Sequence, residues 1–237
     1  MKKKKGQDEV YSSLEVIILA GGLGTRLADC LGDTPKCLAP INNVPFISYI
    51  LEKLQDLGFQ NICLATGYLS SNIEMYIKET DFNLNIRFSK EHSQLGTGGA
   101  VKKSIKSSCY DNFLVINGDT YFDFDLKNLV TENTRDYLVL TCFVDKSDQY
   151  GKVISNSKNL ITRFEEKNSK GEAEVNAGVY LLHKSVIQYM PNDVFSLEKE
   201  TFIKLVEEKL LYKKNVQGKF IDIGTPENYH IAQREIS

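Results

Sequence analysis

Short apolar runs alternate along the chain with segments of helical periodicity. Four runs are typical of strands that are buried on both faces of a sheet; they cover residues 16–19, 61–66, 113–116 and 137–144. The second half contains further strand patterns at residues 151–155, 160–164 and 175–182, and we expect some of these strands to be antiparallel.

The segments between the runs carry helix signals. Apolar residues at i, i+3, i+4 and i+7 follow Pro45, and Gly58 is the expected end of this helix. Ser71 with Glu74 three positions later predicts a capping box at the start of the next helix. The last helix is expected to begin at Thr225 and Pro226, with Thr225 as its N-cap.

This alternation predicts the fold class. Strands separated by helix-length segments form βαβ units, so we expect an α/β, single-domain, Rossmann-like fold with a mostly parallel twisted sheet and helices on both faces. Residues 14–237 show no linker or repeat and are predicted to form one domain. Residues 1–13, with four lysines at positions 2–5, are predicted to be a flexible tail, for which a membrane-surface role is the alternative.

Composition and charge exclude several classes of protein. The 237 residues include 29 Lys+Arg and 31 Asp+Glu, a balance that argues against nucleic acid as the partner. No apolar run approaches the ~18 residues of a membrane-spanning helix. The five cysteines form no C-x-x-C pair, which favours reduced thiols in the cytoplasm over disulfides or a zinc site.

Two glycine-rich segments are candidates for nucleotide binding. The first, Leu19–Leu27, has three glycines and is followed by Pro35 and Lys36, so backbone N–H groups, Arg26 and Lys36 could hold a polyphosphate. It is neither a dinucleotide fingerprint nor a P-loop, and a tight structural turn is the alternative. The second, Leu95–Ala100, could form a backbone wall against a nucleobase or be a surface loop.

Two aspartates are candidates for metal binding. Asp119 and Asp222 lie far apart in the sequence, and each ends an apolar strand pattern. Carboxylate oxygens at strand ends suit Mg²⁺, which also shares the phosphates of a substrate. For each aspartate the alternative is a turn or a helix cap.

A third group of residues could bind a sugar phosphate. Lys167, in Phe164–Lys167, could hold a phosphate, and Asn176 could bond sugar hydroxyls. An exposed charged loop is the alternative for the first of these segments. The three histidines show no ligand spacing, so we interpret them as structural or surface residues.

Taken together, these motifs resemble the sugar-1-phosphate nucleotidyltransferases from Glu15 to Ala232. The family pattern L-A-G-G-x-G-T-R-L, P-K, N-G-D, F-x-E-K, N-A-G and D-I-G-T-P appears here in order. The resemblance implies a reaction in which a sugar 1-phosphate attacks a nucleoside triphosphate with loss of pyrophosphate, with Mg²⁺ as the cofactor.

The resemblance also implies roles for individual residues. The catalytic residues would be Arg26, Lys36 and Asp119, and the metal ligands Asp119 and Asp222. The nucleotide would contact Leu19, Ala20, Gly21, Gly22, Gly24, Thr25, Arg26 and Gly96. The sugar phosphate would contact Gly151, Glu166, Lys167 and Asn176.

Within this family the chain is most similar to the D-glycero-α-D-manno-heptose 1-phosphate guanylyltransferases, which implies GTP as the nucleotide and a product for surface polysaccharide synthesis. Mannose 1-phosphate guanylyltransferases and N-acetylmuramate 1-phosphate uridylyltransferases are the alternatives, and a non-catalytic nucleotide-sugar-binding regulator is an alternative of another class. Ala28–Cys30 departs from the proline that many members carry after T-R-L. The oligomeric state stays open.

Overall fold

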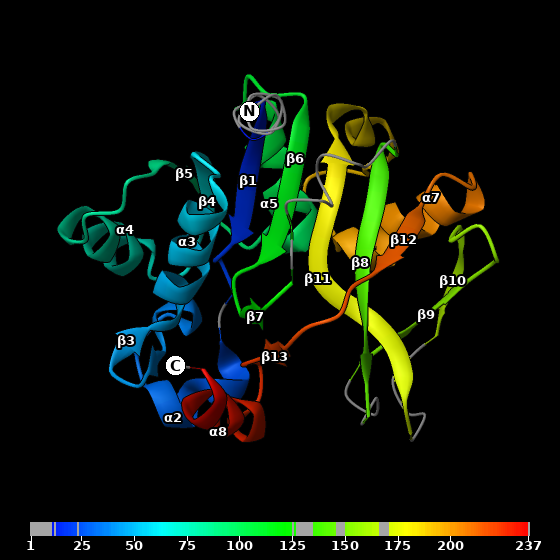
Figure 1. Cartoon of the computed structure of the whole chain (residues 1–237). Helices are drawn as coiled ribbons and strands as arrows, with labels where there is room; N and C mark the ends of the chain where they lie inside the picture. Colours follow the sequence, from blue (N-terminus) through cyan, green and yellow to red (C-terminus); the bar gives the residue numbers. More distant parts are fainter. Residues whose placement is uncertain are drawn as a thin grey trace, which may run out of the picture.

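The computed structural model describes residues 11, 13–22, 24–124, 126, 135–145, 150–165 and 171–236. In these residues a nine-stranded sheet carries helices on both faces, and two short antiparallel ribbons lie outside it (Figure 1). None of the described helices is long and apolar enough to cross a bilayer. The expected α/β single-domain fold is confirmed.

Four parallel strands form one half of the sheet, in the order β6-β1-β4-β5. Their bounds are β1 Leu14–Leu19, β4 Asn61–Thr66, β5 Asn85–Lys90 and β6 Asn112–Asn117. Because the chain runs from β1 outward to β4 and β5 and then returns to β6, the direction of winding reverses between β1 and β6. In open α/β sheets, ligands bind beyond the carboxyl ends of the strands at such a reversal.

Antiparallel strands extend the sheet beyond β6, as expected for the second half of the chain. β11 pairs antiparallel with β6, β8 and β9, and β12 pairs parallel with β8. The bounds of these strands are β8 Tyr137–Val144, β9 Lys152–Ser155, β10 Ile161–Glu165, β11 Ala173–His183 and β12 Tyr212–Asn215. The parallel character of the sheet is therefore concentrated in the half that carries β1.

The remaining elements are helices and two ribbons. The α-helices are α2 Ala28–Leu31, α3 Phe46–Leu57, α4 Ser70–Glu79, α5 Gly96–Lys106, α7 Phe202–Glu207 and α8 Pro226–Glu235. The other helical turns are η1 Thr25–Leu27, η2 Lys36–Leu38, η3 Lys184–Tyr189 and the π-helical η4 Leu197–Thr201. The ribbons pair β2 Pro40–Ile41 with β3 Val44–Pro45, and β7 Thr120–Phe122 with β13 Phe220–Asp222.

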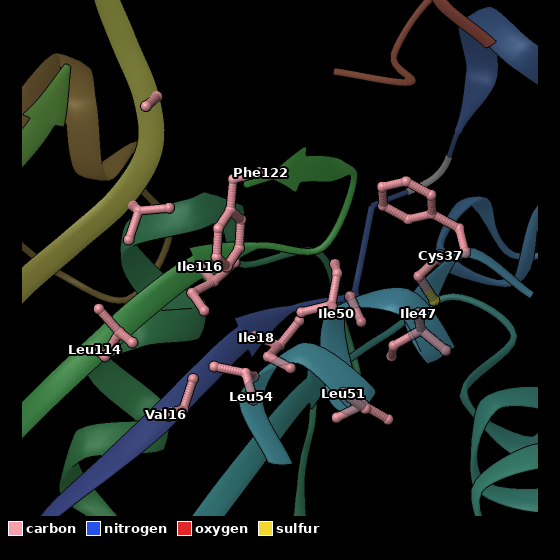
Figure 2. Close-up of a cluster of buried hydrophobic side chains, with 14 of the residues drawn as sticks. Val16, Ile18, Cys37, Ile47, Ile50, Leu51, Leu54, Leu114, Ile116 and Phe122 are labelled. Atoms are coloured by element: carbon pink, nitrogen blue, oxygen red, sulfur yellow. The ribbon is translucent and has the colours of Figure 1, made fainter. Parts of the chain in front are cut away.

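The alternation of side chains along β1 separates two hydrophobic layers. Val16 and Ile18 face the layer that contains Ile50 of α3, as Figure 2 shows. Ile17, between them, faces the opposite layer, which contains Val101 of α5. All five side chains are at most 2% exposed, and full burial of such a side chain contributes about 1.5–3 kcal/mol. Helices therefore cover both faces of the sheet, as predicted.

Local helix signals were predicted with mixed success. Gly58 ends α3 in the left-handed region at φ 92°, and the Thr225 side chain caps α8 by accepting from the Asn228 N–H. The predicted capping box at Ser71 is wrong, because α4 begins at Ser70 and its N-cap is Leu69 without a side-chain bond.

The predicted tail ends close to the packed part of the chain. Tyr11, which falls within residues 1–13, is 3% exposed, and its ring lies 4.9 Å from that of Phe59. The lysines at positions 2–5 lie outside the described residues.

Gly118 marks a close approach of two strand ends. Its N–H donates to the Leu19 carbonyl at 3.0 Å, and a Cβ at this position would lie 2.5 Å from that oxygen. We expect Gly118→Ala to destabilise the protein by roughly 1–3 kcal/mol, the cost of overpacking. Urea unfolding measures this, with Gly22→Ala, whose Cβ would meet nothing within 4 Å, as the matched control. Equal stability of the two variants would contradict the prediction.

Candidate active site

A cleft of about 230 Å³ opens where the direction of sheet winding reverses, beyond the carboxyl ends of β1 and β6. Its walls come from the loops after these strands, from η2, from the loop after β5 and from the start of α5. The lining residues are Leu19, Ala20, Gly21, Gly22, Lys36, Cys37, Glu91, Gln94, Gly96, Thr97, Ala100, Asn117, Gly118 and Asp119. Both glycine-rich segments therefore contribute to one cavity.

The glycines allow the cleft to have a wall of bare backbone. A Cβ on Gly21 would lie 3.2 Å from Glu91 Oε1 and 3.3 Å from the Gly67 nitrogen. Gly96 has a φ of 73°, and a Cβ there would lie 2.5 Å from the Phe195 carbonyl oxygen. At both places the close packing leaves no room for a side chain, so backbone forms this part of the cleft lining.

The structure brings together the two aspartates that lie far apart in the sequence. Asp119 follows β6, and Asp222 ends β13, which pairs with β7 and not with the large sheet. In this ribbon Asp222 is opposite Thr120, and the Ile223 N–H donates to the Asp119 carbonyl at 2.9 Å. The predicted meeting of the two acids is confirmed, although the strand that carries Asp222 is not part of the main sheet.

Lys36 lies between the two carboxylates. Its Nζ donates to Asp119 Oδ2 and lies 4.0 Å from Asp222 Oδ1. Burial and the neighbouring Asp119 raise the pKa of Asp222, while Lys36 and the Gly224 N–H lower it. Two acids that repel each other across one lysine form a site that favours additional positive charge.

The first glycine loop places its cation beside this acid pair. Gly24 adopts the left-handed region at φ 63° and lies against Lys36, because its Cβ would be 3.4 Å from the Lys36 Cβ. Thr25 and Arg26 follow in η1 and are exposed. Arg26 lies close enough to lower the pKa of Asp222 by its charge. The loop thus presents one arginine toward the acids, as a polyphosphate site requires.

The predicted sugar-phosphate residues are placed in part. Asn176 lies on β11 beside a bulge at which Gly178, with φ 68°, approaches Asn117 of the cleft. Gly151 follows Tyr150, whose pKa is raised to about 12 by burial and by Asp222. Asn176 thus lies two positions from a contact with the cleft, and Gly151 lies next to a tyrosine that the charge of Asp222 influences; their roles in binding the sugar phosphate stay predictions.

Glu166 and Lys167 lie outside the described residues. The described part of β10 ends at Glu165, whose carbonyl oxygen would lie 3.2 Å from a Cβ on Gly151. The roles assigned to Glu166 and Lys167 stay predictions.

Three lining side chains lie outside the segments that the sequence analysis named, namely Cys37, Glu91 and Gln94. Glu91 follows β5, a strand that the analysis did not predict. Its Oε2 accepts from the Leu95 N–H at 3.0 Å, and partial burial raises its pKa. Burial raises the pKa of Cys37 to about 12, so this thiol stays protonated and is no nucleophile.

Comparisons with known proteins identify the family of the chain. Residues 15–237 match a family model described as nucleotidyl transferase. The D-glycero-alpha-D-manno-heptose 1-phosphate guanylyltransferase of Campylobacter jejuni is 39% identical over 92% of this chain and 97% of that protein. The enzyme of the same name from Aneurinibacillus thermoaerophilus is 36% identical over 94% of this chain and 98% of its own length.

A solved structure extends the likeness to three dimensions. The crystal structure of HddC from Yersinia pseudotuberculosis complexed with GMP-PN is 34% identical, with a TM-score of 0.83 over 94% of this chain and 99% of that chain. Sequence and fold agree, and the chain belongs to the nucleotidyl transferase family.

Proposed function

We propose that this chain is a guanylyltransferase that joins GTP and D-glycero-α-D-manno-heptose 1-phosphate to form GDP-heptose and pyrophosphate. The observation that carries the proposal is the convergence of Asp119, Lys36 and Asp222 at the mouth of a glycine-walled cleft. Relatives covered over nearly their whole length bear this enzyme name. The product would be a sugar donor for surface polysaccharide synthesis, as the resemblance implies.

The proposed chemistry needs positioning and charge neutralisation, and it needs no general base. A phosphate monoester loses its second proton with a pKa of about 6, so the sugar phosphate is already ionised at pH 7. One of its oxygens bonds to the α-phosphorus of GTP while the bond from that phosphorus to the bridging oxygen breaks and pyrophosphate leaves. Arg26 would hold the departing phosphates, and Lys36 would lie near the reacting ones.

Asp119 and Asp222 are the residues that would hold Mg²⁺. No group of three or more metal-ligating side chains occurs among the described residues. Two carboxylates suffice, since Mg²⁺ keeps several waters and takes substrate phosphates as ligands. Burial and the neighbouring Asp119 raise the pKa of Asp222 although Lys36 lies beside it, so a single ammonium only partly compensates the two carboxylates, and a divalent cation would add the missing positive charge. Bound there, Mg²⁺ would neutralise charge on the reacting phosphates.

Glu91 supports guanine as the base. A carboxylate only accepts hydrogen bonds, and guanine offers adjacent N1–H and N2–H donors on one edge. Oε2 of Glu91 already bonds the Leu95 N–H, while Oε1 faces Gly21 across the cleft wall. This places an acceptor where the backbone wall would hold a base.

Glu91→Gln is expected to lower kcat/KM for GTP roughly 10–100-fold, the scale of losing a hydrogen bond to a charged group. The preference for GTP over ITP, which lacks the 2-amino group, should shrink with it. Pyrophosphate release with both nucleotides measures this. Glu74→Gln, on the neighbouring ion pair with Lys90, is the matched control. An unchanged preference for GTP over ITP would exclude Glu91 as a reader of the base.

Pyrophosphate release from a panel of substrates tests the function itself. The panel combines GTP, UTP, CTP, dTTP and ATP with heptose, mannose and N-acetylmuramate 1-phosphates. We expect the fastest turnover with GTP and the heptose, loss of turnover in EDTA, and recovery with Mg²⁺. A different preferred pair would correct the substrate assignment, and no turnover with any pair would overturn the proposed activity.

We also propose a reducing compartment, the cytoplasm, as the site of action. All five cysteines are free, and Cys30 and Cys109 are exposed. Exposed free thiols are typical of proteins that do not meet oxidising conditions.

A further inference from the structure

The segment Phe195–Lys199 is not explained by the proposed chemistry, and it holds a carboxylate between the two substrate regions. Glu198, in the first turn of η4, accepts three hydrogen bonds from hydroxyl groups. Its Oε2 accepts from Thr97 at 2.8 Å and from Ser196 at 3.0 Å, and its Oε1 accepts from Tyr180 at 3.2 Å. One carboxylate therefore joins α5, β11 and η4.

On one side, Glu198 fixes the nucleotide loop. Thr97 lines the cleft, and its hydroxyl donates to Glu198 while accepting from the Leu197 N–H at 2.9 Å. The adjacent Gly98 N–H donates to the Phe195 carbonyl at 3.0 Å. A Cβ on Gly98 would overlap the Phe195 ring, so the loop packs directly on this segment.

On the other side, Glu198 fixes the strand that carries Asn176. The Tyr180 hydroxyl donates to Glu198 and accepts from Asn176 Nδ2 at 3.0 Å. The oxygen of the same side chain, Asn176 Oδ1, accepts from the Gly178 N–H at 2.8 Å. Complete burial raises the pKa of Tyr180 well above its ordinary value, so the hydroxyl keeps the proton that it donates.

The contacts form one chain, from Thr97 through Glu198 and Tyr180 to Asn176. Its first member lies in the nucleotide cleft and its last on the side assigned to the sugar. α5, which carries Thr97, and α7, which continues from η4, lie on one face of the sheet (Figure 1). Tyr180 belongs to the same hydrophobic cluster as Val101 of α5 and Phe202 of α7. We therefore expect a shift of the nucleotide loop to displace the Asn176 amide through these linked hydrogen bonds.

We propose that Glu198 is a positioning residue that couples the nucleotide loop to the sugar-binding strand, so that each substrate strengthens the binding of the other. The inference rests on the proposed function, which supplies the two substrates. Glu198 acts through Thr97 and Tyr180 and touches neither substrate. By thermodynamic reciprocity, the coupling must be equal in both directions.

Titration calorimetry tests the coupling. The dissociation constant of the sugar 1-phosphate is measured with and without a non-hydrolysable GTP analogue, in the wild type and in Glu198→Gln. The glutamine amide can no longer accept at both positions, so we expect the ratio of the two constants to fall about tenfold toward one. Glu200→Gln, whose carboxylate bonds only the Ser196 N–H of this segment, is the matched control and should keep the wild-type ratio.

Tyr180→Phe serves as the second variant. It removes one hydroxyl and keeps the ring that packs edge-on against Phe202 at 5.0 Å. We expect it, like Glu198→Gln, to lower the ratio of the two dissociation constants about tenfold toward one, by the same factor whichever substrate is titrated. A double mutant with Glu198→Gln should add little to either single change, because both break the same chain.

Hydrogen exchange of the free protein separates this proposal from the proposed function. In Glu198→Gln the amides of Gly98 and Gly178 should both exchange faster, whatever the substrates are, because both segments lose their common anchor. Faster exchange confined to residues 196–200, or a wild-type coupling ratio of one, would overturn the proposal. Absence of turnover with GTP in the wild type would instead overturn the function and leave the exchange result standing.

Discussion

Asp222→Ala is expected to lower kcat roughly 10²–10⁴-fold, the scale of losing a major electrostatic stabiliser of a transition state. The side chain lies beside Asp119 and Lys36, where two anions must approach each other during the reaction. Without this carboxylate the site would hold Mg²⁺ less tightly, and the reacting phosphates would lose the charge compensation that the ion would supply. Pyrophosphate release under saturating substrates measures kcat.

Two further variants separate catalysis from folding. Asp123→Ala removes a carboxylate four positions after Asp119 that pairs with Lys53. Asp123 is 63% exposed, so this change should leave kcat within about twofold. Asp222→Asn keeps the shape and removes the charge that Asp119 repels, so its urea midpoint should equal or exceed that of the wild type. Full activity of Asp222→Asn would exclude a charge role for Asp222.

The location of the site was predictable because two strong signals coincide. The apolar runs at residues 16–19 and 113–116 form β1 and β6. Gly21 and Asp119, each two positions after the end of its strand, therefore lie at one edge of the sheet. Neighbouring parallel strands end at the same edge, whatever the rest of the chain does. The periodicity of the sequence thus determined where a ligand could bind.

The partner strand of Asp222 could not be predicted in the same way. β13 and β7 have only three residues each, and their pairing depends on contacts between remote segments. Such short strands carry little periodic signal, so the sequence indicated an acid at a strand end without the strand that pairs with it. The pairing of Asp222 with Asp119 was expected from the motifs, and the fold added that β13 lies outside the main sheet.

Glu91 was missed because the strand before it, β5, has only a weak alternation of apolar and polar residues. Only Ile86 and Phe88 alternate with polar residues in Asn85–Lys90, and both are just partly buried at the sheet edge. An alternating strand ending at Lys90 would have placed Glu91 at the carboxyl edge of the sheet, but β4 lies between β5 and β1, so the approach of Glu91 to Gly21 follows only from the fold. The bonds of Glu198 to Thr97 and Tyr180, in contrast, join residues 101 and 18 positions apart, and no local pattern reports them.

Lys36→Met is expected to lower kcat/KM roughly 10²–10³-fold, because one cation serves both the acid pair and the phosphates. Lys36 is 13% exposed and sits in a three-residue turn held by Pro35, so no other described lysine is positioned to replace it. Lys36→Arg should rescue little, since a planar guanidinium cannot take the place of a point charge between two carboxylates.

The same substitution should also make stability depend on pH in a defined direction. Without the ammonium group, Asp119 and Asp222 repel each other when both are ionised, so the loss of stability in Lys36→Met should be larger at pH 8 than at pH 5. Urea unfolding at both values measures this. Lys53→Met, which breaks the ion pair with the mostly exposed Asp123, should show a small loss at either pH. Equal losses for Lys36→Met at the two pH values would mean that its ammonium does not hold the acid pair together.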